Sequence, residues 1–305
     1  MPSISARFSG LLLQLQEVLL HHTLLTTRGR SVSRVVSVGS SVGHLTYFVL
    51  SVPLSRVVHD AFNLRLEPYV KHEMSTLSRI IHDIKSGAIN KIAFLTGAGM
   101  STSSGIPDFR SPGGMYDTLR PELLTATEDD RRIMKNNPTA VVDIDLFKRN
   151  QFPYLEVRRP FIIGTAEKKW KATLSHYFTR VCQDRGKLSR VYTQNIDGLD
   201  YQVGLNEDMI IPLHGTIGKA SCEFCSQEYP IDEFRQDVAS NIKNIYDPND
   251  ETAPPKSQNI VCKKCNRPGV KASTVMYGSS LPASALSTAA SDFPANVDLL
   301  IIIGT

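Results

Sequence analysis

The sequence predicts an α/β protein built on a doubly wound, Rossmann-like parallel sheet, with an inserted small zinc-binding module and a helical module. Three observations predict this fold class. A glycine-rich turn follows the first of several strand-like runs, and two Cys-x-x-Cys pairs interrupt the series. Short apolar or β-branched runs also alternate with helical patterns, as they do where helices join parallel strands. The runs are Ile92–Leu95, Ser189–Thr193, Met209–Pro212, Thr274–Tyr277 and Val297–Ile303.

The composition is that of a globular protein with one large domain. The chain has 305 residues, of which 41% are hydrophobic, and this is enough for a sizeable core. The net charge of +4 is concentrated near the start, because residues 1–74 hold seven Lys+Arg and four Asp+Glu, leaving 27 against 26 for the rest. A nearly neutral body argues against direct nucleic-acid binding, which requires a clustered basic excess.

Residues 1–74 are expected to form a leader that lies outside the catalytic fold. From Met1 to His59 there are five arginines, ten serines, no lysine and the single acid Glu17, a composition typical of an organellar transit peptide. The leucines between Leu11 and Leu25 have helical spacing, which suits an amphipathic presequence. The alternatives are a disordered leader, or untranslated sequence included in a gene model, with a cytoplasmic or nuclear location.

A membrane span has to be considered between Val35 and Ser55, because this segment carries no formal charge. A spanning helix needs about 20 predominantly apolar residues. Several serines, two glycines, His44 and Pro53 make the segment too polar for that role. We therefore expect no membrane span.

The catalytic domain is expected to begin at Ser75. This serine can cap a helix that ends before Gly87 and keeps the i, i+3, i+4, i+7 apolar spacing, at Leu77, Ile80, Ile81 and Ile84. The strand Ile92–Leu95 follows at once. Helix, strand and glycine-rich loop in this order are the usual entry to a doubly wound sheet.

The glycine-rich loop after this strand is expected to bind a dinucleotide. Gly97 and Gly99 let the backbone approach a ligand closely, and Met100–Ser104 can open a helix whose free N–H groups face a pyrophosphate. The third glycine, Gly105, departs from the usual G-x-G-x-x-G spacing. A glycine-rich turn without a ligand is therefore the alternative at this point.

The charged segment from Met115 to Pro160 is expected to form a flexible lid or a small helical module. Three prolines divide it into short helices, and they are Pro121, Pro138 and Pro153. Thr165 is then expected to cap a long helix with one apolar face. Within that helix we interpret His176 as a structural hydrogen-bonding residue and Cys182 as a small buried hydrophobic residue.

Two polar motifs follow strands at the edge where open α/β sheets bind ligands. The first, TQNIDGL from Thr193 to Leu199, offers amide and carboxylate groups that can bind ribose hydroxyls and a carboxamide. Taken alone, it is also an ordinary polar turn. The second, Leu213-His214-Gly215, presents an imidazole at the next strand end. Histidine is the natural general base near neutral pH.

Four of the five cysteines form two Cys-x-x-Cys pairs, and the four residues are Cys222, Cys225, Cys262 and Cys265. Four thiolates complete a closed tetrahedral site, so the metal they predict is one structural zinc ion. The 36 residues between the pairs exceed the common spacing of about 15 to 20. A polar, proline-broken surface insertion from Asn244 to Asn259 accounts for the excess. Two disulfides are the alternative.

Taken together and in this order, five motifs resemble the sirtuin family. They are GAGMSTSSGIPDFRSP at 97–112, TQNIDGL at 193–199, LHG at 213–215, VMYGSSLP at 275–282 and IIGT at 302–305. The resemblance is to the class I deacetylases and runs from about Ser75 to Thr305. Ser279 stands where the family usually has an acid, and the G-T-S motif is only begun. The catalytic domain, 75–305, with its zinc module at 220–268, is therefore expected to be incomplete at its C-terminal end.

The resemblance implies a set of site residues. His214 is implied to be the catalytic base that removes a proton from the cofactor ribose. The residues implied to bind NAD are Gly97, Ala98, Gly99, Ser101, Thr102, Ile106, Asp108, Phe109, Arg110, Tyr116, Gln194, Asn195, Ile196, Asp197, Gly304 and Thr305. The residues implied to bind the acylated peptide are Val275, Met276, Tyr277 and Gly278.

By the same resemblance, the expected reaction is NAD-dependent deacetylation of lysine in peptides or proteins, with nicotinamide and O-acetyl-ADP-ribose as products. Family members that prefer succinyl-lysine have a Tyr-x-x-Arg pair, and none occurs between Arg110 and Trp170, which favours a neutral acyl group. The alternatives are an NAD-dependent protein ADP-ribosyltransferase and an inactive scaffold that binds NAD and zinc.

Overall fold

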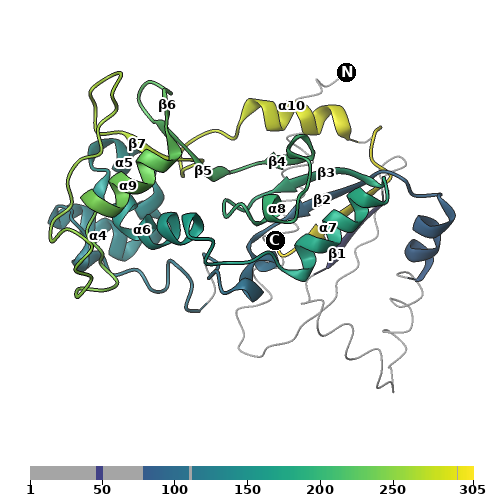
Figure 1. Cartoon of the computed structure of the whole chain (residues 1–305), viewed down its shortest axis with the longest axis horizontal. Helices are drawn as coiled ribbons and strands as arrows, with labels where there is room; N and C mark the ends of the chain where they lie inside the picture. Colours follow the sequence, from purple (N-terminus) through teal and green to yellow (C-terminus); the bar gives the residue numbers. More distant parts are fainter. Residues whose placement is uncertain (1–45, 51–77, 110–111, 294) are drawn as a thin grey trace, which may run out of the picture.

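The protein is organised around a five-stranded parallel sheet (Figure 1). The structure, a computed structural model, describes residues 46–50, 78–109, 112–293 and 295–305. The strand order is β1-β8-β2-β3-β4, and each neighbouring pair is parallel. The strands are β1 (Thr46–Leu50), β2 (Ile92–Thr96), β3 (Leu188–Thr193), β4 (Ile210–Pro212) and β8 (Leu299–Ile303). The parallel α/β sheet predicted from the sequence is confirmed.

Helices cover both faces of this sheet, because successive side chains of a strand point to opposite sides. On one face, Phe94 and Val191 share an apolar cluster with Ile80 and Cys182. On the other face, Tyr192 shares a cluster with residues of α10. The covering helices are a helix over residues 78–86, α7 (Leu174–Asp184) and α10 (Ala283–Asp292). The sheet is therefore doubly wound, as expected.

Strand β1 lies within the range 1–74 that is expected to be a leader. It forms the edge of the sheet next to β8, with Thr46 opposite Leu299 and Leu50 opposite Ile303. The rest of the expected leader, including its leucine-rich segment, lies outside the described residues. In the part of the chain that the structure describes, no helix is long and apolar enough to span a bilayer.

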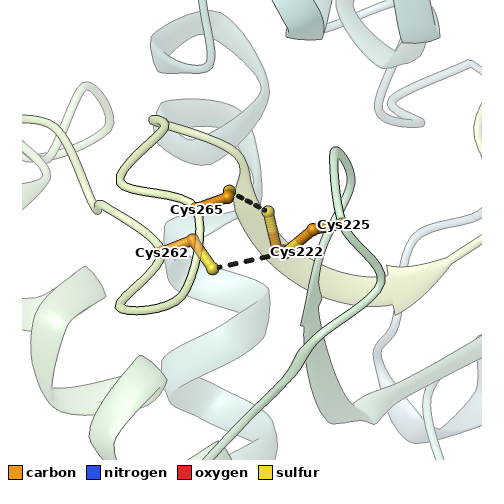
Figure 2. Close-up of side chains that lie close together, drawn as sticks. All are labelled: Cys222, Cys225, Cys262 and Cys265. Carbon is orange, nitrogen blue, oxygen red and sulfur yellow. Dashed lines mark hydrogen bonds between the residues drawn. The ribbon is translucent and has the colours of Figure 1, made fainter.

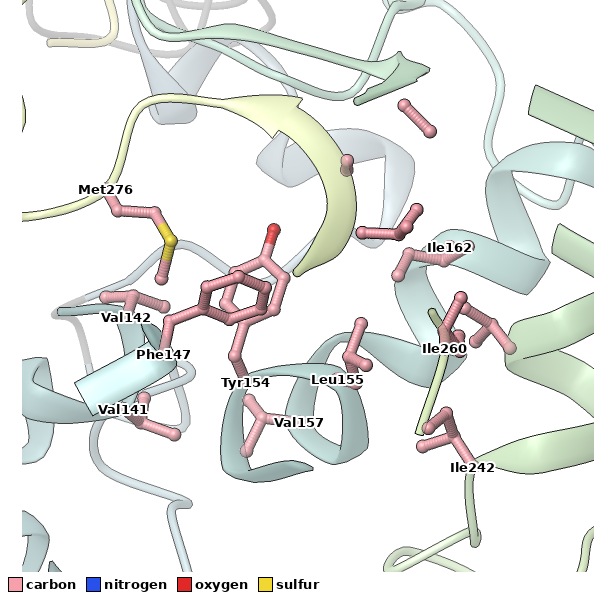
Figure 3. Close-up of a cluster of buried hydrophobic side chains, with 14 of the residues drawn as sticks. Val141, Val142, Phe147, Tyr154, Leu155, Val157, Ile162, Ile242, Ile260 and Met276 are labelled. Atoms are coloured by element: carbon pink, nitrogen blue, oxygen red, sulfur yellow. The ribbon is translucent and has the colours of Figure 1, made fainter. Parts of the chain in front are cut away.

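The segment from Met115 to Pro160 begins a packed helical module. Its helices are α4 (Glu128–Asn136), α5 (Ile144–Arg149) and α6 (Phe152–Ala166), with 3-10 turns at Pro121–Leu123 and Pro138–Val142. Pro121, Pro138 and Pro153 each lie in the first turn of an element, where the missing N–H group removes no hydrogen bond. The rings of Phe147 and Tyr154 meet edge to face in its core, 5.3 Å apart (Figure 3).

A second, smaller sheet packs against this helical module. Its strands are antiparallel in the order β6-β5-β7, and they are β5 (Gly215–Cys222), β6 (Glu228–Tyr229) and β7 (Val270–Thr274), accompanied by the helix α9 (Ile231–Asn241). Side chains from both units share one apolar core, in which Ile260 lies between Ile162 of α6 and Ile242 (Figure 3). The two additions to the parallel sheet therefore form one packed body.

The insertion Asn244–Asn259 is a loop that is held against α6 by polar side chains. Arg159 Nη1 lies 3.2 Å from the Asp250 carboxylate, and the Ser257 hydroxyl donates to Glu156 at 2.6 Å. Both Arg159 and Glu156 are buried. The expected surface insertion is thus present as a loop, but buried charged groups anchor it.

Two elements differ from those expected. Thr165 lies inside α6 and caps nothing, whereas α7 begins after Thr173, whose side chain forms a reciprocal capping box with His176. The strand expected at Thr274–Tyr277 is β7 at Val270–Thr274, because antiparallel pairing with β5 sets its limits. The strands β2, β3, β4 and β8 agree with the expected runs to within two residues at each end, whereas β1, β5 and β6 were not expected.

Candidate active site and metal centre

The glycine-rich loop after β2 packs directly onto the end of β8. Gly97 N–H donates to the Ile303 oxygen at 3.0 Å, and Gly99 N–H donates to the Gly304 oxygen at 2.8 Å. A Cβ on Gly97 would lie 2.5 Å from the Gly304 oxygen, and a Cβ on Gly304 would lie 2.4 Å from the Met100 nitrogen. Two loops far apart in the sequence therefore meet backbone to backbone, and a side chain at either position forces them apart.

The loop itself forms two 3-10 turns, η1 (Ala98–Met100) and η2 (Thr102–Ser104). The prediction that Met100–Ser104 opens a helix is therefore wrong. Hydroxyl groups explain the difference, since Thr102 Oγ1 donates to the Gly99 oxygen and Ser104 Oγ donates to the Ser101 oxygen. Such local bonds compete with helix formation. Gly105 then ends the run in a left-handed conformation, with φ of 89°.

Three predicted cofactor-binding side chains meet in a buried polar cluster between this loop and the end of β3. Ser101 Oγ donates to Asp197 Oδ2 at 2.7 Å, and Asn195 Nδ2 donates to Ser101 Oγ at 3.3 Å and to the Gly97 oxygen at 2.9 Å. All three side chains belong to buried residues. A fixed amide, hydroxyl and carboxylate of this kind can bind a carboxamide or sugar hydroxyls.

His214 lies at the end of β4, beside this cluster. Its Nδ1 lies 2.9 Å from the main-chain oxygen of Gln194, and because a carbonyl oxygen only accepts, Nδ1 carries the hydrogen and Nε2 is left as the basic nitrogen. Burial lowers the pKa of His214 below its ordinary value, while the hydrogen bond to Gln194 opposes that shift. The imidazole is therefore neutral near pH 7, with Nε2 able to accept a proton.

The predicted peptide-binding residues run from His214 to the helical module. Val275 N–H donates to the His214 oxygen at 2.9 Å, and Tyr277 exchanges main-chain hydrogen bonds with Val142 and Ile144, each 3.0 Å long. Met276 is buried and Tyr277 is 43% exposed. Gly278 follows in a left-handed conformation, with φ of 85°. This segment joins the base to the helical module as one extended edge.

The loop after the glycines lines an open pocket of about 270 Å³, bordered by Thr102, Gly105, Ile106, Pro107, Asp108, Pro112, Gly113 and Gly114. Phe109 and Tyr116 stack near it with ring centroids 6.0 Å apart, and the Arg158 guanidinium lies 5.2 Å from the Phe109 ring centroid. Arg110 lies outside the described residues. Ile196 is buried, and its oxygen accepts from Ile217 N–H at 3.0 Å.

The four paired cysteines converge on one point, although the sequence separates the two pairs widely (Figure 2). Their sulfur atoms all lie within 4.8 Å of one another, with 3.6 Å between Cys222 and Cys265 and 3.7 Å between Cys225 and Cys262. Sulfur ligands about 2.3 Å from a tetrahedral zinc lie about 3.8 Å apart, whereas a disulfide requires about 2.05 Å. The arrangement fits zinc and excludes the alternative of two disulfides.

Two residues of this region were not predicted as site residues. The Thr173 hydroxyl donates to the Met100 oxygen at 2.9 Å and so ties the start of α7 to the glycine-rich loop. Asp200 is buried close to Asp197. The T-x-x-H spacing before α7 was the available signal for Thr173, but a histidine at its fourth position differs from the usual Glu or Gln of a capping box.

Comparison with known families matches residues 97–305 to the Sir2 family. The chain belongs to the Sir2 family. Among curated sirtuins, it is 35% identical over 235 residues to the NAD-dependent protein deacetylase sirtuin-2 of Danio rerio, covering 75% of this chain and 53% of that relative. It is 31% identical over 231 residues to the NAD-dependent protein deacetylase sirtuin-3 of Mus musculus, covering 75% and 59%.

This Sir2 chain also resembles solved structures. One, from work on sirtuin substrate affinity, aligns with a TM-score of 0.51 and 26% identity over 70% of this chain and 72% of the other. Another, from work on the mechanism and regulation of Sir2 enzymes, gives the same score and identity over 71% of each chain. The chain spans a little more than half the length of the first curated relatives, at 53% and 57%.

Proposed function

We propose that this Sir2 chain is an NAD-dependent protein lysine deacetylase. The observation that carries the proposal is the position of His214, whose Nδ1 is fixed by the Gln194 oxygen so that Nε2 is free to accept a proton. The cluster of Ser101, Asn195 and Asp197 lies at the same edge of the sheet. Curated relatives described as NAD-dependent protein deacetylases support the same activity.

In this proposal, NAD supplies the ADP-ribose that accepts the acetyl group and releases nicotinamide. Gly97 and Gly99 bring the backbone close to the diphosphate, and Gly304 and Thr305 begin the adenosine side of the site. Asn195 and Asp197 bind the carboxamide, with Ile106 beside them. His214 Nε2 takes a proton from a ribose hydroxyl, and Phe109 keeps water away from the reacting carbon.

We also propose roles for the remaining predicted residues. Ala98, Thr102, Asp108, Tyr116, Gln194 and Ile196 complete the cofactor site, with Arg110 on the phosphates. Val275 to Gly278 binds the acylated lysine peptide along its extended backbone, where the exposed Tyr277 faces outward. The acyl group is neutral in this assignment, because no Tyr-x-x-Arg pair occurs between Arg110 and Trp170.

The four-cysteine site has a structural role in this proposal. A closed set of four thiolates leaves no ligand position open for water or substrate. One zinc ion would therefore hold the small sheet together. It would also fix β5, the strand that follows His214, against its partner β7. None of the chemistry at the ribose passes through this metal.

The activity is tested by measuring nicotinamide release from NAD by the native full-length protein, with and without an acetylated lysine peptide. Release only in the presence of the peptide, together with formation of free lysine, supports the deacetylase. Release without the peptide, with label transferred from NAD to protein, indicates an ADP-ribosyltransferase. No turnover by the native protein, despite NAD and zinc binding, indicates a scaffold.

We propose, finally, that residues 1–74 direct the protein to an organelle, most simply the mitochondrion. The support is compositional, since arginine and serine are abundant from Met1 to His59 and Glu17 is the only acid there. A fluorescent reporter fused behind residues 1–60 tests this. Uniform cytosolic fluorescence contradicts the organellar proposal and favours a cytoplasmic or nuclear protein.

A further inference from the structure

Two buried side chains beside the polar cluster each leave one polar atom without a partner. His176 of α7 is 0% exposed, and Asp200 of the short helix α8 (Leu199–Gln202) is 2% exposed. Among the described residues, nothing hydrogen-bonds to His176 Nε2 or to Asp200 Oδ1. Unpaired buried polar atoms are rare in folded proteins, and each requires an explanation.

The hydrogen bonds of His176 fix its tautomer. The Thr173 main-chain N–H donates to Nδ1 at 3.1 Å, and because an N–H group only donates, Nδ1 is the acceptor. A neutral ring therefore carries its hydrogen on Nε2, which becomes the unpaired donor. Burial lowers the pKa of His176 to about 4, with the Asp197 charge opposing the shift, so the ring is neutral at physiological pH.

Asp200 can complement it, since its unpaired Oδ1 accepts a hydrogen bond when the carboxyl group is ionised and can carry the proton when it is not. Its side chain is hydrogen-bonded to Thr193, and Thr193 Oγ1 in turn accepts from Asn195 N–H at 3.1 Å. Burial and the neighbouring Asp197 charge raise the pKa of Asp200 to about 7. Asp200 is thus protonated over much of the acidic to neutral range, and below that pKa the cluster holds one negative charge, on Asp197.

Asp197 is the common neighbour of both side chains. It interacts electrostatically with His176 from α7 and with Asp200 from α8, while Ser101 donates to one of its oxygens at 2.7 Å. The other oxygen accepts from Leu199 N–H at 2.9 Å. A neutral N–H donor and a protonated carboxyl group are neighbours that favour a buried carboxylate, whereas a second carboxylate repels it.

We propose that His176 and Asp200 are positioning residues that fix the orientation and charge of Asp197, and through it the pocket for the nicotinamide carboxamide. This rests on the proposed function, because it takes the cluster of Ser101, Asn195 and Asp197 as the nicotinamide pocket. Neither residue touches the ligand. A buried water molecule bonded to His176 Nε2 and Asp200 Oδ1 would complete the network.

The test uses His176→Gln and Asp200→Asn in the full chain, with Cys182→Ala as the matched control. Cys182 is also buried on α7 but belongs to the apolar cluster, so its truncation reports general packing loss. Binding of nicotinamide and of NAD is measured by calorimetry, and folding by thermal melting followed by circular dichroism. We expect His176→Gln to weaken nicotinamide binding about tenfold, because Asp197 then loses the neighbouring imidazole that favours its ionised form.

The pH dependence of binding separates positioning from a purely structural role. The titratable groups around Asp200 are Asp197, Tyr201 on its own helix and, through Asp197, His176 on α7. Wild-type nicotinamide binding is expected to weaken as the pH rises from 6 to 8, because Asp200 then ionises next to Asp197. The Asp200→Asn variant is expected to bind equally at both pH values.

The proposal is overturned if both variants fold and bind nicotinamide as the wild type does, with the same pH dependence. It is also overturned if the loss of binding in His176→Gln only matches that in Cys182→Ala. Should His176→Gln fail to fold, Asp200→Asn decides the matter, since it keeps the shape of the side chain. If the wild type binds nicotinamide but deacetylates no peptide, only the proposed activity is rejected. If it binds neither NAD nor nicotinamide, both proposals are rejected.

Discussion

The imidazole Nδ1 of His214 lies 2.9 Å from the main-chain oxygen of Gln194, in the motif that also supplies Asn195 and Asp197. His214 and the polar cluster are therefore linked through the segment Gln194–Asp197, which follows β3 directly. This hydrogen bond needs no particular side chain at position 194. It depends only on the backbone, which is set by the parallel pairing of β3 and β4.

The deacetylase activity is expected to fall at acidic pH, with the midpoint of this fall below pH 6.5. Only neutral His214 accepts a proton, and burial lowers the pKa of His214 below the ordinary value of 6.5. Activity should therefore rise with pH through that lowered pKa, and any decline above pH 6 that comes from Asp200 should be absent from the Asp200→Asn variant. The check is kcat/KM for NAD across pH 5 to 8. An acid limb centred above 6.5 contradicts the assignment, and His214→Tyr should abolish turnover without changing zinc content.

Removal of the metal is expected to unfold the small sheet. Replacing Cys225 and Cys262 by serine leaves two of four thiolates, so the free energy of unfolding should fall by roughly 5 kcal/mol or more. Cys182→Ala is the control, because this fifth cysteine is remote from the four-sulfur cluster. Metal analysis of protein purified under reducing conditions should give one zinc per chain. Metal-free protein with unchanged stability contradicts the site.

Gly97→Ala is expected to destabilise the protein by about 1–3 kcal/mol and to weaken NAD binding. Gly97 has φ of −137°, which any residue adopts, so its conformation is not the obstacle. The added Cβ would lie 2.5 Å from the Gly304 oxygen and 2.7 Å from Thr305 Cα. Gly218→Ala is the control, since its nearest contact is a side-chain oxygen at 3.4 Å. Denaturant unfolding and calorimetry give the two readouts, and equal effects of both substitutions refute the steric argument.

Two truncations separate the leader from the sheet edge. Deletion of residues 1–45 should leave the melting temperature unchanged, whereas deletion of residues 1–74 should leave the protein folded but less stable. The reason is that the second deletion also removes β1 and exposes the edge of β8, where unpaired N–H and C=O groups favour aggregation. Circular dichroism and light scattering measure both effects. Equal melting temperatures for the two truncations show that β1 adds nothing to the fold.

Against an opposite contribution from His176, whose pKa is lowered from 6.5 to about 4, Asp200 is expected to reduce the stability of the protein as the pH rises from about 4 towards 7. Its pKa is raised from 3.8 to about 7, so between these values the folded state binds more protons than the unfolded state. Each rise in pH then favours unfolding, and the contribution is constant above the folded pKa. Asp200→Asn should remove this part of the decline. Identical pH profiles of the free energy of unfolding for both proteins contradict the raised pKa.

The sequence predicted the parallel sheet and the convergence of the four cysteines because both follow from local patterns. Strand runs and Cys-x-x-Cys pairs are visible one segment at a time. The motifs predicted from the sequence also include Ser101, Asn195 and Asp197. The hydrogen bonds among these three residues form only when β2 and β3 pair. The resemblance to the family, more than composition, predicted His214 among eight histidines as the catalytic base.

Elsewhere, side-chain hydrogen bonds determine where a helix begins or fails to form, which the apolar pattern does not predict. Thr165 was expected to begin a helix, but His176 turns back onto the Thr173 N–H and starts α7 there instead. In the glycine-rich loop, the hydroxyl groups of Thr102 and Ser104 bond to nearby carbonyls and give short turns in place of a helix. Each of these local structures depends on one or two polar atoms, and hydrophobic periodicity carries no information about such atoms.

The four-sulfur module joins the parallel sheet through two adjacent chain crossings, with Gly215 paired to Thr274 immediately after His214. The loop Asn244–Asn259 lies on the side of that module away from the parallel sheet (Figure 1), held by Arg159 and Glu156 of α6. Loss of Asp250 or Ser257 would leave a buried charged group of α6 without its partner, whereas the other positions of this loop carry no such contact with Arg159 or Glu156. In evolutionary terms, these remaining loop positions are where this lineage can change its surface without disturbing the candidate site.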